Sequence, residues 1–248
     1  MRDLLKTAVT NPKEFAVRLY IKVTYRIVRI IDGMRDKRLC GYDLTRRRKV
    51  EVEGATAYNP TVYWALDEIF KDAVFSANDH LVDIGCGMGR VIAYLMDKKF
   101  PGQLTGIEYD PYVAAVARKW MEKDKSGRVR LIEGDALKAE YDQYTILYLF
   151  RPFSEEFFYR MILRLEEQLT HPIQLYYLTD FYSRKYLAGR QGWEMVSRRS
   201  IFMKYGLCLF GSPQYFSVWR YCPTARGSAQ RLRDQTAAWL CEKPLGFS

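Results

Sequence analysis

The stretch LVDIGCGMGR, residues 81–90, decides the fold of this chain. It leads from a short apolar segment, typical of a buried strand, through Gly85, Gly87 and Gly89 into an apolar helical pattern. A chain that turns this sharply from strand to helix needs glycine, because glycine adopts positive φ and lets a ligand approach the main chain closely. Asp83 stands two residues before the first glycine. The stretch therefore predicts a ligand site at the end of a strand.

Strand and helix patterns alternate on both sides of this stretch. Strands are expected in residues 80–85, 103–110, 128–135, 144–150 and 172–180. Helices are expected in residues 59–70, where Pro60 marks the start, and in 89–99, 111–124, 154–169 and 181–189. This alternation predicts a parallel sheet with helices on both faces, and ligands of such sheets lie at the carboxyl ends of the strands.

The end of the pattern is different. Residues 193–203 and 214–222 are both strand-like, with no convincing crossover helix between them, so they are expected to pair antiparallel. Three regions follow from the whole pattern. They are a basic N-terminal helical extension and linker (1–55), a Rossmann-like domain (56–222) and a C-terminal tail that could add one helix (223–248).

The spacing of the glycines bears on the ligand. Nicotinamide and flavin sites normally have GxGxxG, with a pyrophosphate on the helix N-terminus, whereas this chain has GxGxG. The carboxylate of Asp83 suits a cation better than a pyrophosphate. S-adenosylmethionine carries both a sulfonium and an ammonium group. An NAD-dependent oxidoreductase is the enzymatic alternative, and a degenerate, non-catalytic adaptor is another.

Three further motifs follow in order along the chain. Glu108 ends the second strand in GIEYD, where a carboxylate can accept both ribose hydroxyls. Asp135 and Ala136, in EGDA after the third strand, can bind an adenine amino group and ring. Leu149 to Phe153, in LYLFRPF after the fourth strand, lie at the reactive end of the cleft.

With these motifs in this order, the sequence resembles the class I S-adenosylmethionine-dependent methyltransferases over about residues 56–222. The resemblance implies a doubly wound α/β sheet of seven strands, mostly parallel with the last strand antiparallel. It also implies S-adenosylmethionine as cofactor and no metal. The expected cofactor-binding residues are Asp83, Gly85, Cys86, Gly87, Gly89, Glu108, Tyr109, Asp135, Ala136 and Leu149.

Arg151, Phe153 and Tyr58 are the residues expected near the transferred methyl group. Many amino-group methyltransferases have an acidic residue or Asn, then Pro-Pro-aromatic, at the fourth motif, whereas this chain has Arg-Pro-Phe. Arginine has no acceptor with which to hold an amine. It suits a carboxylate or phosphate of the substrate, or it pairs structurally with Glu155. Tyr58 precedes a proline ahead of the glycine motif, an arrangement similar to that of seven-strand protein-lysine methyltransferases.

The methyl acceptor is left open by the sequence. Protein lysine or a small molecule is slightly preferred, and RNA bound through the basic arm is the alternative. Scattered cysteines without a CxxC pair and only two histidines argue against a disulfide framework, a zinc cage and histidine-based catalysis. Reduced thiols favour a cytoplasmic location.

Basic residues gather at the N-terminus, where residues 1–50 hold 14 Lys and Arg against 5 Asp and Glu. On a helix, Arg18, Lys22, Arg26 and Arg29 form a cationic stripe opposite an apolar stripe of Phe15, Leu19, Val23, Ile27 and Ile30. Four charges argue against a transmembrane span. The apolar stripe is expected to cover the protein's own core or a second subunit. Alternatively, the arm binds an anionic partner, which would be phosphate, an acidic lipid surface or an acidic protein.

Overall fold

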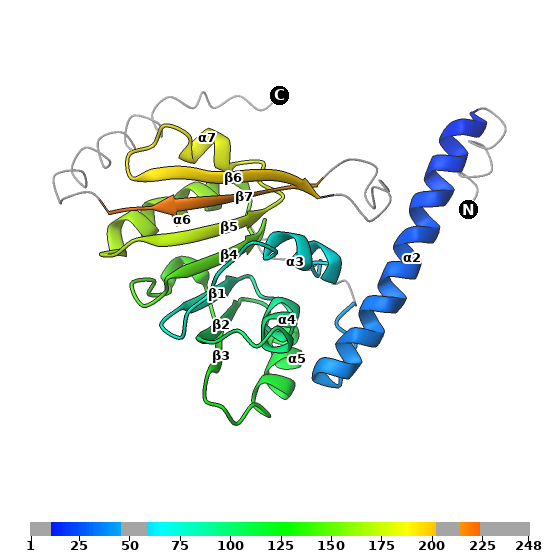
Figure 1. Ribbon diagram of the computed structural model, residues 1–248, viewed down its shortest axis with the longest axis horizontal. Coiled ribbons are helices and arrows are strands. Elements are labelled where there is room, and N and C mark those ends of the chain that lie inside the picture. Colours follow the sequence, from blue (N-terminus) through cyan, green and yellow to red (C-terminus); the bar gives the residue numbers. More distant parts are fainter. Residues whose placement is uncertain (1–10, 46–58, 202–213, 224–248) are drawn as a thin grey trace.

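The computed structural model describes residues 11–45, 59–201 and 214–223. Seven strands form a single sheet in the order β3-β2-β1-β4-β5-β7-β6 (Figure 1). The strands are β1 (His80–Ile84), β2 (Gln103–Glu108), β3 (Val129–Glu133), β4 (Ile146–Phe150), β5 (Ile173–Leu178), β6 (Trp193–Ile201) and β7 (Gln214–Tyr221).

The strand directions confirm the predicted sheet. Strands β1 to β5 pair in parallel, whereas β7 lies antiparallel between β5 and β6. Asp83 of β1 lies opposite Gly106 of β2 and Tyr148 of β4. The order of the strands changes direction at β1 and β4. In open sheets of this kind, ligands bind in a crevice outside the carboxyl ends of such strands, so this is where a ligand is expected.

The helices are α2 (Pro12–Cys40), α3 (Tyr63–Ile69), α4 (Arg90–Asp97), α5 (Pro111–Met121), α6 (Glu155–Gln168) and α7 (Ser183–Leu187), with a short 3-10 helix η1 (Ala136–Lys138). Local chemistry explains the limits of several of them. Helix α5 begins at Pro111 because the side chain of Asp110 accepts hydrogen bonds from the first free amides. Helix α2 ends where Gly41 takes the left-handed conformation.

Helix α3 begins three residues later than Pro60, so the predicted start was wrong. Val62 is extended and takes the N-cap position. Thr61 is held outside the helix by two buried contacts. Its hydroxyl lies 3.0 Å from the Tyr148 hydroxyl, and its carbonyl accepts a hydrogen bond from Arg90 at 3.2 Å. These tertiary contacts override the local preference of proline for a helix start.

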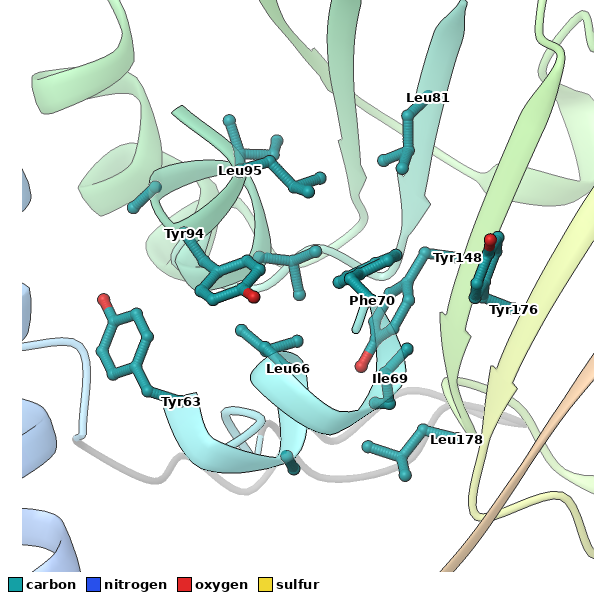
Figure 2. Packing of buried hydrophobic residues seen from close by; sticks show 14 of the residues in the cluster. Tyr63, Leu66, Ile69, Phe70, Leu81, Tyr94, Leu95, Tyr148, Tyr176 and Leu178 are labelled. Carbon is teal, nitrogen blue, oxygen red and sulfur yellow. The ribbon is translucent and has the colours of Figure 1, made fainter. Parts of the chain in front are cut away.

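Two hydrophobic cores enclose the sheet. The first joins one sheet face to α3, α4 and α5, and the second joins the other face to α6 and α7. Figure 2 shows the first core, in which the ring of Phe70 after α3 lies against Tyr148 and Tyr176 of the sheet. Both faces of the sheet are therefore buried, and the carboxyl ends of β1 and β4 rest on a packed support.

Helix α2 runs along one side of the domain, with its carboxyl-terminal part against α4 (Figure 1). Val28, Gly33 and Cys40 are buried there, but most of the predicted apolar stripe is exposed. The expectation that this stripe covers the protein's own core is therefore wrong for the part of the chain that is described. No described helix combines the length and apolarity that crossing a bilayer requires.

Candidate functional site

The three glycines of the opening stretch all have positive φ, at 75°, 60° and 87° for Gly85, Gly87 and Gly89. Gly89 is the N-cap of α4, so the free amides at the start of this helix face the loop. Two glycines also meet close neighbours. A Cβ on Gly85 would lie 2.6 Å from Cβ of Pro152, and one on Gly89 would lie 2.6 Å from the Trp120 ring. The loop thus requires glycine for its conformation and for its packing.

The indole of Trp120 also fixes the loop by a hydrogen bond. Its Nε1 donates to the carbonyl of Met88 at 2.9 Å, within the glycine stretch. The loop conformation is therefore set by α5 as well as by the glycines.

Asp83 is almost fully buried at the end of β1. Its Oδ2 has no hydrogen-bond partner among the residues that the structure describes. Burial and the nearby carboxylate of Glu108 raise the pKa of Asp83 well above its usual value. A buried carboxylate oxygen without a donor is costly, and a cationic ligand beside it would remove that cost.

Glu108 joins the end of β2 to the glycine loop. Its Oε2 accepts a hydrogen bond from the amide of Gly87, and its Oε1 accepts one from the amide of Asp110, both at 2.8 Å. Burial raises the pKa of Glu108, and these amides act in the opposite direction. The carboxylate of Glu108 is thus held beside the glycine loop, and its role in binding ribose stays a prediction.

The third motif caps the helix η1. The side chain of Asp135 accepts a hydrogen bond from the amide of Leu137 at 2.9 Å and remains partly exposed. Ala136 is buried, and its carbonyl accepts a hydrogen bond from the hydroxyl of Tyr141 at 2.8 Å. One oxygen of Asp135 is therefore engaged in a turn, and its role toward adenine stays a prediction.

The remaining predicted cofactor residues differ in how exposed their side chains are. Cys86 is buried, and burial raises the pKa of its thiol well above the usual value. Tyr109 is exposed. Leu149 is buried in the second core, so its side chain packs against the helices of that face. Any contact of Leu149 with a ligand would have to come from its backbone.

The fourth motif follows β4. Arg151 has a φ of 38°, which is unusual for a residue other than glycine, and its guanidinium lies 5.4 Å from the ring centroid of the exposed Phe181. Glu155, its alternative partner, accepts hydrogen bonds from Lys185 and Tyr186. Phe153 packs against the second core. Tyr58 lies outside the described residues.

A pocket opens beside these residues, between the start of α3 and the carboxyl ends of β4 and β5. About 310 Å³ of space lies between its walls and in the open solvent at its mouth, and the walls include Thr61, Trp64, Phe150 and Thr179. Nε1 of Trp64 is buried without a hydrogen-bond partner in the described parts of the chain. The exposed lining of the pocket is mainly apolar.

Thr179 is strained at this pocket. It has a φ of 58°, which is rare for a β-branched residue, and its hydroxyl donates to Oε1 of Gln214 at 3.0 Å. Strained backbone of this kind concentrates at ligand sites and is held by surrounding structure. Here the holding contacts come from β7.

A buried ion cluster ties α2 to the glycine loop, and sequence reasoning missed it. Arg90, the first residue of α4, donates to Asp36 from Nε at 3.0 Å and from NH2 at 2.5 Å, and to Asp32 from NH1 at 3.1 Å. Asp36 also accepts from the hydroxyl of Tyr63 at 2.8 Å and from the amide of Leu44 at 3.1 Å. In the sequence, the indication of this cluster was a pair of acids, Asp32 and Asp36, four residues apart in a basic segment.

Comparisons with known proteins find similarity to methyltransferases. Residues 81–160 match the family model of a methyltransferase domain. A probable ribosomal RNA small subunit methyltransferase A of Methanosarcina barkeri (strain Fusaro / DSM 804) is 30% identical over 118 residues, which are 46% of this chain. The match spans only 40% of that relative.

Two solved structures share the fold. A methyltransferase from Pyrococcus furiosus is 17% identical, with a TM-score of 0.56, over 80% of this chain and 98% of that one. TrmN from Thermus thermophilus is 12% identical, with a TM-score of 0.51, over 65% of this chain and 49% of that one. At these identities the likeness concerns the fold alone.

Proposed function

We propose that this chain is a class I S-adenosylmethionine-dependent methyltransferase that transfers a methyl group to a small acceptor with an apolar body and an anionic group. The match of residues 81–160 to a methyltransferase domain and the order of the seven strands support the first half of this proposal. The pocket between α3 and the ends of β4 and β5 is the observation that carries the acceptor class. A purely polar acceptor would gain little from walls such as Phe150 and Trp64, whereas an apolar group would lose its contact with water there.

The residues of the crevice fit the cofactor of this superfamily. Asp83 offers a buried carboxylate oxygen that has no donor, and the cofactor carries positive charge. Glu108 lies within hydrogen-bond reach of the glycine loop and keeps further acceptor capacity for ribose hydroxyls. The main chain at Gly85 and Gly87 would hold the amino-acid part of the cofactor, while Asp135 and Ala136 would hold adenine.

The protein residues mainly align the acceptor and exclude water. When bound, S-adenosylmethionine supplies a methyl group on a sulfonium, which is already activated for in-line displacement. The pocket is joined to the glycine loop, because the carbonyl of its wall residue Thr61 accepts from Arg90 at the start of α4. This bond supports a fixed distance between acceptor and cofactor.

Arg151 directly follows the pocket wall at Phe150, and we assign it to the anionic group of the acceptor. A guanidinium binds carboxylate and phosphate through paired donors, and it cannot hold an amine. The arginine therefore favours an anionic small molecule over a lysine side chain. Arg151→Lys keeps the charge but loses the paired geometry, so it is expected to raise KM for the acceptor without changing cofactor affinity.

The experiment that tests the proposal uses a labelled methyl donor. The protein is incubated with a fractionated cell extract, and label is then counted in RNA, in protein and in small molecules separated by organic extraction. We expect label in the small-molecule fraction and none with Gly87→Val, which blocks the cofactor loop. Calorimetry with S-adenosylmethionine and NAD tests the first half of the proposal separately, because binding of NAD alone would overturn the cofactor assignment.

RNA is the second candidate acceptor. The similarity to a probable ribosomal RNA methyltransferase and the basic N-terminal region support it. Label in the RNA fraction would decide for this candidate. We also propose a cytoplasmic location, because Cys40, Cys86 and Cys222 are free thiols.

A further inference from the structure

The side of α2 that points away from the domain is apolar and exposed. Six of its apolar side chains are each more than two-fifths exposed, and Ile30 and Met34 reach 63% and 68%. We call this surface the outer face of α2, formed by Leu19, Val23, Ile27, Ile30, Ile31 and Met34. At about 100° per residue, these six side chains fall within an arc of about 120°. They form one continuous stripe along the helix.

The opposite side of the same helix is the one that docks on the domain. Asp32 and Asp36 are buried there against Arg90. By the same helical count they point about 180° away from the centre of the outer face. A flat surface can therefore approach the outer face without meeting the sheet or α4.

By the same helical count, Arg26 lies about 20° and Lys22 about 60° beyond one edge of the outer face, and few acids accompany these cations. Residues 12–31 contain five Lys and Arg and one Glu, and that Glu14 pairs with Arg18. Lys13, Lys22 and Arg26 are exposed, and no carboxylate in the described parts of the chain pairs with them. Long basic side chains at the edge of an apolar stripe can reach from it to anionic head groups.

We propose that the outer face of α2 binds the surface of an anionic lipid bilayer, with α2 lying in the plane of the interface. The apolar stripe enters the boundary of the acyl chains, and the cations at its edges contact the head groups. A second copy of the chain fits less well, because a two-fold contact would bring the cationic edges of both helices together. RNA would engage the cations and leave the apolar stripe in water.

Vesicle sedimentation of the full chain tests this proposal. We expect binding to phosphatidylcholine vesicles that contain phosphatidylglycerol, little binding to phosphatidylcholine alone, and weaker binding as salt increases. Ile30→Asp places a charge in the stripe and is expected to reduce binding about tenfold or more. Arg26→Gln is expected to reduce it about fivefold.

The matched control is Val74→Asp, which changes an apolar residue that is 95% exposed outside α2 and should bind vesicles like the wild type. Cofactor affinity by calorimetry should be unchanged in every variant, so this readout separates membrane binding from the proposed activity. Equal binding to both vesicle types would overturn the proposal, and so would equal vesicle binding by the wild type and Ile30→Asp. It would also be overturned if the wild type were a dimer, Ile30→Asp were a monomer, and neither bound vesicles. Retention on RNA that vesicles fail to compete would do the same.

Discussion

Replacing Asp36 by alanine should strongly destabilise the protein. The carboxylate is fully buried and accepts hydrogen bonds from Arg90, from Tyr63 and from the amide of Leu44. Its removal leaves the buried guanidinium of Arg90 with Asp32 as its remaining charged partner in the described cluster. Breaking a buried pair by removing one partner costs about 3–5 kcal/mol.

This cost translates into a measurable shift in melting temperature. For a chain of this size each kcal/mol corresponds to roughly 2–4 °C, so Asp36→Ala should lower Tm by roughly 6–20 °C. Differential scanning calorimetry and urea unfolding provide the two measurements. Cofactor affinity should also fall, because Arg90 is the first residue after the glycine loop. A Tm within 2 °C of the wild type would refute the reasoning.

Asp32, the other buried acid of the cluster, supplies the control, because its replacement should change stability in the opposite direction. Burial raises the pKa of Asp32 to about 6, despite its contact with Arg90. The folded protein therefore holds this proton more tightly than the unfolded chain, so the resulting stability is full below about pH 4 and is lost as pH rises through 6. Asp32→Asn should thus be neutral or stabilising by about 1–3 kcal/mol at pH 7. A loss of stability at pH 7 equal to that of Asp36→Ala would contradict this assignment.

Four further predictions concern the crevice and the pocket. Glu108→Ala should weaken S-adenosylmethionine binding by about 1–3 kcal/mol, measured by calorimetry, whereas unchanged affinity would remove Glu108 from the site. The pKa values of Asp83 and Glu108 are raised in the free protein, so binding of S-adenosylmethionine should release protons and become tighter as pH rises. The affinity for S-adenosylhomocysteine, whose sulfur is uncharged, should depend less on pH. Equal pH profiles for the two ligands would argue against a carboxylate facing the sulfonium. Gly85→Ala should cost more stability than Gly127→Ala, by about 1–3 kcal/mol, because both have positive φ but only Gly85 would meet Pro152. Thr179→Gly should raise stability by about 1 kcal/mol and lower acceptor turnover, and a loss of stability would show that its hydroxyl bond to Gln214 outweighs the strain.

The sheet was predictable because each strand and helix is marked by a pattern within its own short stretch of sequence. Strands such as β1 and β4 are short apolar runs, and the helices between them repeat apolar residues at helical spacing. The antiparallel pairing of β6 and β7 was also predictable, because no crossover helix was expected between them. The glycines and Glu108 meet at one edge for the same topological reason.

What could not be predicted depends on contacts between distant residues. The start of α3 is set by hydrogen bonds of Thr61 to Tyr148 and Arg90, which lie far from it in the sequence. Likewise, a helical pattern shows that α2 has an apolar stripe, but it does not show which side docks. Buried charges on the opposite side decide that question, because Asp32 and Asp36 pair with the buried Arg90 there.

The contact between Gly85 and Pro152 limits how new acceptor specificity can arise in this scaffold. Because the first glycine and the proline after β4 are in close contact, any exchange of this loop between related enzymes must preserve the shape of the proline. Its neighbours Arg151 and Phe153 carry no such requirement toward the glycine. Libraries that vary Arg151, and keep Pro152 and the core residue Phe153 fixed, should therefore change substrate choice while leaving the cofactor site functional.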